Sequence, residues 1–337
     1  MNNSTAAPEP GLYDIIRDAG VIPVVVILSG IKAFIGLIGI VFNLSLVYVT
    51  VKNKSLHGPC NVLIALNALC MAIYELSFEI SMYVVATGIN LITVMECFFW
   101  QFIPAFMKYF TLCLMLVIGL DRLICLLFPF WNKNKFYLMY LSFMVGVCAL
   151  IGVYCIYISV RADLKMANGE VMCTVSDVSQ QGSSETVFLI AFILNVATII
   201  CYAFFAVAMM RTSKKNRSSN VKFTRSIFKS LMLIMIVDVL GWGSNTVFQY
   251  WFHLFDTWKF GALEKWCIST VNGYLLSLAT TAEAPILYFC SKEYRKAYHR
   301  QFQAIDAHLR PNRTRDLTTV KTGTSANASQ TKPSTTT

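Results

Sequence analysis

Residues 112–131 read LCLMLVIGLDRLICLLFPFW, a run that is almost wholly apolar but carries an acid and a base, Asp121 and Arg122, side by side. About 20 apolar helical residues span the ~30 Å hydrocarbon core of a bilayer. A charge in that core is costly unless it is paired or reaches water at the interface. The run therefore predicts a membrane-spanning helix whose charged pair has a special place or role.

Apolar segments of similar length recur along the chain. The sequence has 337 residues, of which 56% are hydrophobic and 14% are charged, too few polar side chains to cover a soluble protein of this size. We expect an all-α membrane protein with a seven-transmembrane helix bundle, because these segments are about twice as long as the strands of a membrane barrel. The predicted spans are residues 21–50, 60–87, 98–128, 136–160, 187–210, 226–252 and 266–289.

The basic residues predict which side of the membrane each loop occupies. With the N-terminus outside, the cytoplasmic segments hold 20 of the 28 Lys and Arg residues, and the outer segments hold five. Basic flanks are retained in the cytoplasm, so we expect a multi-pass plasma-membrane protein with a cytoplasmic C-terminus. The net charge of +10 is then a topology signal and predicts no nucleic-acid partner. We expect the first span, and no removable signal peptide, to direct insertion.

The chain shows one membrane domain with two tails and no internal repeat. Asn2 and Asn3 are overlapping glycosylation acceptors in the N-terminal tail. Near the other end Tyr294, Tyr298 and Phe302 recur every four residues among basic ones, which predicts an amphipathic helix with its aromatic rings in the lipid of the inner leaflet. The predicted parts are the extracellular tail 1–20, the membrane domain 21–290, the amphipathic helix 291–303 and a disordered, Ser/Thr-rich cytoplasmic tail 304–337.

Two of the eleven cysteines stand apart from the rest. Most cysteines lie within spans, where a thiol behaves as a small apolar side chain. Cys97 opens the third span on the outer side, and Cys173 lies in an outer loop, where the environment permits oxidation. We expect a disulfide that ties this loop across the mouth of the bundle. The alternative is two free thiols.

The charged pair lies about 24 residues after Cys97, or ~36 Å of helix at 1.5 Å per residue. This spacing places Asp121 and Arg122 at the inner membrane interface. An Arg there can extend toward water while the neighbouring carboxylate offsets its charge. Breaking that pairing is a plausible switch, and a plain interfacial anchor is the alternative.

Several motifs together, in their order and spacing, resemble the rhodopsin-like G-protein-coupled receptors over nearly all seven spans. Within that superfamily, NKSLHGPCNVLIALNAL (53–69) and GLDRLICLLFP (119–129) look most like the nematode serpentine chemoreceptors of the SRSX class. The matching features are Asp121-Arg122-Leu123 for the Asp-Arg-Tyr motif, Asn43 for the first-span Asn, Cys97 and Cys173 for the outer disulfide, Trp242 for the sixth-span Trp, Pro285 and Tyr288 for the Asn-Pro-x-x-Tyr motif, and Tyr294 for the first aromatic of the eighth helix.

The resemblance implies a receptor that binds an extracellular odorant, small molecule or neuropeptide and activates a heterotrimeric G protein. It further implies kinase and arrestin as partners of the tail, the lipid bilayer as surroundings, and no cofactor. Asn43 is expected to serve as a structural polar residue. The residues assigned to the activation switch are Asp121, Arg122, Tyr202, Trp242, Pro285 and Tyr288.

Departures from the family pattern narrow these expectations. Met71 stands where the second span usually carries Asp, Ala284 replaces the seventh-span Asn, and Ser244 replaces the sixth-span Pro. The usual sodium site is therefore not expected. An amine receptor would have Asp at the position of Pro104, and an opsin would have its Schiff-base Lys at Leu278. Neither class of ligand is expected.

Ionisable residues within the spans are candidate ligand contacts, since burying an unpaired charge is costly. Lys108 lies about eleven residues after Cys97, or ~16 Å deep, and predicts an acidic group on the ligand. An equally weighted alternative is internal ion pairing of Lys32 with Glu79 and of Lys108 with Asp238. Aromatic side chains at the outer ends fit a membrane-interface belt as well as a ligand site. The ligand-binding candidates are Lys32, Glu79, Trp100, Pro104, Lys108, Asp238 and Trp242.

Two other classes of function compete with the receptor. Buried charges would also suit a transporter or channel, although the two halves show no matching broken helices. An enzyme is disfavoured because the four histidines lie outside the spans without metal-ligand spacing, and no phosphate loop or serine elbow is present in the sequence. We expect neither catalytic residues nor a metal.

Overall fold

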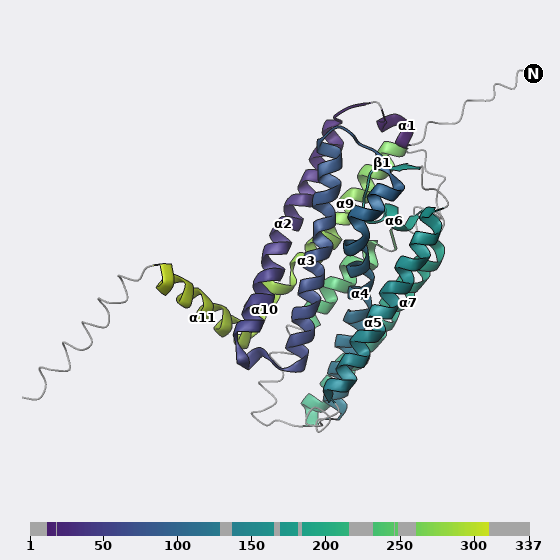
Figure 1. The fold of residues 1–337 in the computed structure, drawn as a ribbon. Coiled ribbons are helices and arrows are strands. Elements are labelled where there is room, and N and C mark those ends of the chain that lie inside the picture. Colours follow the sequence, from purple (N-terminus) through teal and green to yellow (C-terminus); the bar gives the residue numbers. More distant parts are fainter. Residues whose placement is uncertain are drawn as a thin grey trace, which may run out of the picture.

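The computed structural model describes residues 12–17, 19–128, 137–164, 169–180, 184–215, 232–245, 247–248 and 261–309. This part of the chain forms an elongated bundle of helices (Figure 1), which confirms the predicted all-α class. Within it, five helices are long and apolar enough to cross a membrane, and they match the first five predicted spans. They are α2 (Pro23–Lys52), α3 (Pro59–Ala86), α4 (Val94–Leu127), α5 (Tyr137–Asp163) and α7 (Ser184–Lys215).

The sixth predicted span is described only in part, as the apolar helix Met232–Asn245. The seventh differs from the prediction of one continuous span, because α9 (Ala262–Thr281) and α10 (Glu283–Cys290) are separate helices that meet at Ala282. Pro285 explains the break, since it lacks the backbone N–H that would bond to the carbonyl of Thr281 in a continuous helix. The break leaves the neighbouring carbonyl of Thr280 free to accept a hydrogen bond from α2.

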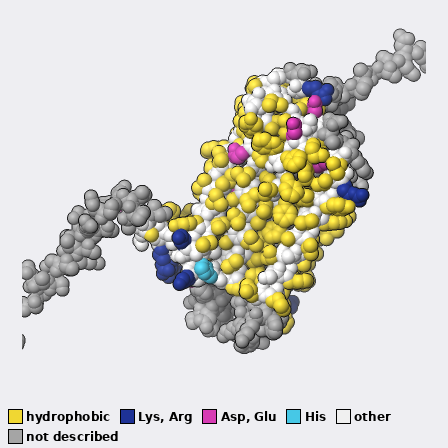
Figure 2. Space-filling view, viewed as in Figure 1, with side chains coloured by type: hydrophobic (Ala, Val, Ile, Leu, Met, Phe, Trp, Pro, Cys, Tyr) yellow, Lys and Arg dark blue, Asp and Glu magenta, His cyan; other side chains and the backbone are white. Residues whose placement is uncertain are grey.

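The long helix α4 is the centre of the bundle. It packs against α3, α5 and α7, while α2 packs against α3 and α9. The largest buried cluster joins residues of α3 and α4 to Trp242 of the sixth predicted span. Apolar side chains such as Phe34, Leu150 and Phe204 are exposed on the outside, and Figure 2 shows hydrophobic atoms covering the visible face between its two ends. A surface of this kind is suited to lipid.

One end of the bundle carries the disulfide and is here named the disulfide end. The strands β1 (Ile92–Thr93) and β2 (Glu170–Val171) pair antiparallel there. Cys97, at the start of α4, is joined to Cys173, which follows β2, so the predicted disulfide is confirmed. Two short helices, α1 (Leu12–Ile16) and α6 (Asp177–Gln180), complete this end.

The opposite end contains Arg122 and is here named the Arg122 end. The short 3-10 helix Lys54–Leu56 joins α2 to α3, and α11 (Lys292–Leu309) projects to one side of the bundle (Figure 1). The helix α11 runs beyond the predicted end at residue 303. Tyr294 and Tyr298 are buried against the bundle and are not immersed in lipid as predicted, whereas Phe302 is 60% exposed. The residues after 309 and the glycosylation acceptors Asn2 and Asn3 lie outside the described residues.

Candidate functional site

The loop after β2 is fixed over the disulfide end by its backbone. Cys173 has a φ of 58°, a left-handed conformation that a non-glycine residue adopts only when its surroundings hold it there. Besides the disulfide, two side chains donate hydrogen bonds to the Cys173 carbonyl, Ser81 Oγ at 2.8 Å and Gln101 Nε2 at 3.0 Å. The loop is therefore attached to both α3 and α4.

Beneath this loop lies a cavity with about 30 Å³ of free space, here named the lysine cavity. Its walls come from α4, the loop, α7 and the Met232–Asn245 helix. Its polar and aromatic lining residues are Lys108, Tyr109, Ser176, Phe188, Asn195, Trp242 and Asn245. The predicted candidates Lys108 and Trp242 thus share one cavity.

The ammonium group of Lys108 lies near an aromatic ring and forms no ion pair with a carboxylate of the described residues. Its Nζ lies 5.5 Å from the centroid of the Tyr109 ring. Among the described residues the ion pairs are Arg17–Glu170 and Arg122–Asp121. The alternative pairing of Lys108 with Asp238 is therefore wrong, because Asp238 faces a different cavity four residues below Trp242.

Lys32 likewise forms no ion pair with Glu79 in the described structure, and its Nζ lies 4.7 Å above the ring of Phe78. The positive charge of Lys32 interacts instead with Asp177, the first residue of α6. Burial raises the pKa of the Asp177 carboxyl above its ordinary value of 3.8, against the hydrogen bond from the Thr174 N–H and the nearby positive charge of Lys32. Burial and the nearby charge of Asp177 together raise the pKa of Tyr13, on α1, to about 12.

The remaining ligand candidates from α3 and α4 do not line the lysine cavity. Trp100 stacks on Tyr83 with ring centroids 6.2 Å apart and is 58% exposed, a position that fits the interface belt. Pro104 is buried within α4. Glu79 lies on α3 with Oε1 buried and without a hydrogen bond in the described structure.

Asn43 anchors a polar network between α2, α3 and α9. Its Nδ2 donates to Glu75 Oε2 at 3.1 Å and to the Thr280 carbonyl at 3.2 Å. The Thr280 hydroxyl donates to Glu75 Oε1 at 3.0 Å, while the Thr281 hydroxyl lies 3.4 Å from the same oxygen and closer, at 2.8 Å, to the Ser277 carbonyl. Glu75 is fully buried, and this network, not Lys32, satisfies its carboxyl group.

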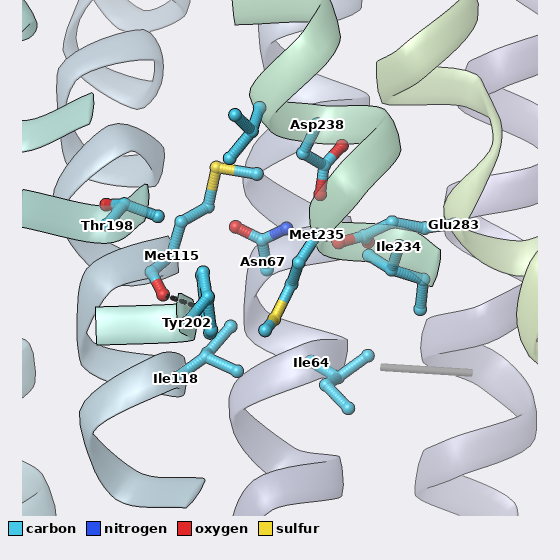
Figure 3. A pocket seen from close by; sticks show the side chains of 11 residues that line it. Ile64, Asn67, Met115, Ile118, Thr198, Tyr202, Ile234, Met235, Asp238 and Glu283 are labelled. Atoms are coloured by element: carbon cyan, nitrogen blue, oxygen red, sulfur yellow. Dashed lines mark hydrogen bonds between the residues drawn. The ribbon is translucent and has the colours of Figure 1, made fainter. Parts of the chain in front are cut away.

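A second cavity lies nearer the Arg122 end and is here named the acidic cavity (Figure 3). It has about 20 Å³ of free space, and its polar lining residues are Asn67, Thr198, Tyr202, Asp238 and Glu283. Asn67 Nδ2 donates to Glu283 Oε1 at 2.5 Å. The predicted switch residue Tyr202 donates from its hydroxyl to the Met115 carbonyl.

At the Arg122 end, Arg122 Nη2 lies 3.2 Å from Asp121 Oδ2. Asp121 is buried and Arg122 is partly exposed, as expected for an interfacial pair. Two other predicted switch residues, Pro285 and Tyr288, lie one turn apart on α10. The centroid of the Tyr288 ring lies 5.7 Å from that of Tyr298 on α11. The pair and the two helices α10 and α11 therefore lie at one end of the bundle.

Sequence reasoning missed several residues of both cavities. Asn195 and Asn245 line the lysine cavity, and Asn67 lines the acidic one. A polar side chain within an apolar span is itself a signal of a buried contact, so these asparagines were detectable in principle. Ser176 lies in a loop, and its sequence surroundings give no such signal.

Residues 34–302 match the sequence model of one protein family, described as serpentine type 7TM GPCR chemoreceptor Srsx. The match includes Asn43, both cysteines of the disulfide, the Asp121–Arg122 pair and Trp242. A comparison with curated proteins gave no match.

Proposed function

The chain belongs to the Srsx family of serpentine seven-transmembrane chemoreceptors, and from this premise we propose that it binds an acidic chemical signal in the lysine cavity and activates a heterotrimeric G protein at the Arg122 end. The family is one of multi-pass membrane receptors and not of enzymes. In this proposal the disulfide end and N-terminus face the outside, and the Arg122 end and C-terminal tail face the cytoplasm.

The lysine cavity carries the proposal for the ligand. Lys108 is held there beside Asn195 and Asn245, and no described carboxylate pairs with it. Lys108 is partly buried, and an ammonium group that is largely removed from water without a counter-ion is costly. A carboxylate or another acidic group on a ligand would therefore gain a charge-assisted hydrogen bond at this position. Asn195 and Asn245 can donate further hydrogen bonds, and Trp242 offers an apolar wall. The ligand is a small acid or a peptide that presents a carboxylate.

The helix Met232–Asn245 is the proposed link between ligand and G protein. Trp242 lines the lysine cavity, and its ring lies 5.7 Å from that of Tyr74 on α3. Asp238, one turn further along, lines the acidic cavity. A ligand that shifts Trp242 moves this helix as a body, and its outward swing opens the Arg122 end to a G-protein helix. Kinase and arrestin then act on the tail.

Ligand-dependent nucleotide exchange tests this function. Carboxylic acids and peptides are added one at a time to membranes that contain the receptor and one heterotrimeric G protein from a panel. The measurement is the amount of a non-hydrolysable GTP analogue that the G protein binds. We expect at least one acid to stimulate exchange, and Arg122→Ala to reduce that stimulation at least about tenfold. Arg161→Ala, an exposed arginine near the disulfide end, is the matched control and retains it.

The competing transporter predicts a different result. If reconstituted vesicles took up solute through buried-charge sites, and no acid stimulated exchange on any G protein of the panel, the receptor mechanism would be wrong. Uptake measured in the same vesicles, with and without the receptor, makes that comparison direct.

A further inference from the structure

The acidic cavity is unusual because three of its buried oxygen atoms accept no hydrogen bond from the described residues. Asp238 is 2% exposed, Glu283 3% and Asn67 1%. Among the described residues, no group donates a hydrogen bond to Asp238 Oδ1, Glu283 Oε2 or Asn67 Oδ1. Buried polar atoms are nearly always paired, so three orphaned oxygens at one small cavity call for an explanation.

The hydroxyl groups that line the cavity do not supply the missing donors. Tyr202 gives its proton to the Met115 carbonyl, and Thr198 gives its proton to the Leu194 carbonyl. The Asn67 amide donates to the other oxygen of Glu283. Figure 3 shows the polar ends of Asp238, Asn67 and Glu283 gathered around the same space.

The electrostatics of the cavity point in the same direction. Asp238 and Glu283 come from different helices and lie close enough to repel each other when both are ionised. None of the described residues that line the cavity is basic. Two carboxylates in a medium of low polarity, with no cation to offset them, are strongly destabilising.

We propose that one dehydrated, sodium-sized monovalent cation binds in the acidic cavity, held by Asp238 and Glu283 carboxylate oxygens and by the Asn67 amide oxygen. Hard oxygen atoms are the ligands that such cations prefer. A free space of about 20 Å³ admits a body of the size of one water molecule. A calcium ion takes six to eight oxygen ligands, more than the three oxygens without a donor at this cavity.

This site is not the one that the resembling receptors build around their second-span Asp. Met71 stands at that position and is buried in an apolar cluster. Glu75, the nearest acid on the same helix, already has its two oxygens satisfied by Asn43 and Thr280. The proposed cation instead ties α3, the Met232–Asn245 helix and α10 together, and its binding is independent of whether an acid activates the receptor.

The test measures the melting temperature of the purified full-length receptor in lipid nanodiscs. Sodium chloride is titrated against N-methyl-D-glucamine chloride at constant ionic strength, and potassium chloride serves as the size control. A ligand that binds only the folded state raises the melting temperature in a saturable way. We expect a rise of several degrees with sodium, and its loss in both Asp238→Asn and Glu283→Gln. Asp163→Asn, at another buried acid, is the matched control and keeps the rise.

Three results would overturn the proposal. They are equal melting temperatures in all salts, an equal response to potassium, or a sodium response that survives Asp238→Asn and Glu283→Gln. Stabilisation by lower pH without any dependence on cation would also overturn it, because the two carboxyl groups would then share a proton instead. If one variant fails to fold, the other still decides the question, and broadening of the sodium-23 resonance by unmodified receptor gives a separate measurement of binding.

Discussion

The lysine cavity and the acidic cavity have similar sizes but opposite charges. About 30 Å³ of free space faces the cation of Lys108 in one, and about 20 Å³ faces the carboxyl groups of Asp238 and Glu283 in the other. The helix Met232–Asn245 borders both, with Trp242 at the first and Asp238 at the second. The opposite charges of Lys108 and Asp238 face different cavities and have not neutralised each other.

This contrast shows that burial within a helix bundle does not by itself bring opposite charges together. Lys108 and Asp238 lie on two helices that each border both cavities, yet the described structure directs the two side chains into separate spaces. Each cavity therefore keeps an unbalanced charge, which a soluble ligand or ion of opposite sign can satisfy. The sign of the charge is why we propose an anion for the cavity near the disulfide and a cation for the cavity near Arg122.

The largest expected effect comes from removing the disulfide. The double variant Cys97→Ser, Cys173→Ser removes a cross-link between residues that are 76 positions apart in the sequence. Losing such a bond typically lowers the free energy of unfolding by ~2–5 kcal/mol. We expect a lower melting temperature and weaker agonist potency, because Ser176 lines the lysine cavity just after Cys173. Cys267→Ser, at a free cysteine, is the control. Loss of the sodium response as well would show that the two cavities do not behave independently.

A smaller effect is expected from Gly119→Ala on α4. The new Cβ would overlap the ring of Tyr202, which lines the acidic cavity, and overpacking of this kind costs ~1–3 kcal/mol. Gly146→Ala on α5 is the matched control, because its Cβ would meet no atom within 4 Å. Melting temperatures of the two variants, measured with and without sodium, separate the outcomes. Equal stability of both variants would mean that Tyr202 is not held as described.

The smallest expected effect concerns pH at the disulfide end. Burial raises the pKa of Asp177 above 3.8, so the folded state holds a proton that the unfolded state has released. Between the ordinary pKa and the raised one, stability from this group therefore falls as pH rises. Melting temperatures measured from pH 4 upward should show that fall in the unmodified protein and a flatter profile in Asp177→Asn. An unchanged profile in the variant would assign the slope to another group.

Much of the fold follows from hydropathy and charge in the sequence. The first five spans agree with the structure because a membrane demands apolar runs of a set length. The disulfide was predictable because sidedness brings Cys97 and Cys173 to one end. The break between α9 and α10 at Ala282 was missed because the segments on both sides of it are largely apolar. Its physical cause, Pro285, was nevertheless visible in the sequence.

The candidate site was less predictable, because a sequence indicates how deep a residue lies in the membrane more readily than which neighbour its side chain faces. Lys32, Glu79 and Trp100 lie at plausible depths, but they do not line the lysine cavity. Which face a helix turns inward depends on how all the helices pack. Glu75 illustrates the same point, since its partners Asn43 and Thr280 become neighbours only when three helices assemble.

The most direct test of the account pairs a carboxylate agonist with its uncharged amide on the unmodified receptor and on Lys108→Met, at matched surface expression, with G-protein nucleotide exchange as the readout. One charge-assisted hydrogen bond is worth ~2–3 kcal/mol, or about 100-fold in potency. We expect the carboxylate to be more potent than its amide by about this factor on the unmodified receptor. On Lys108→Met we expect the two compounds to be equally potent. Equal potency of the carboxylate on both receptors would contradict it.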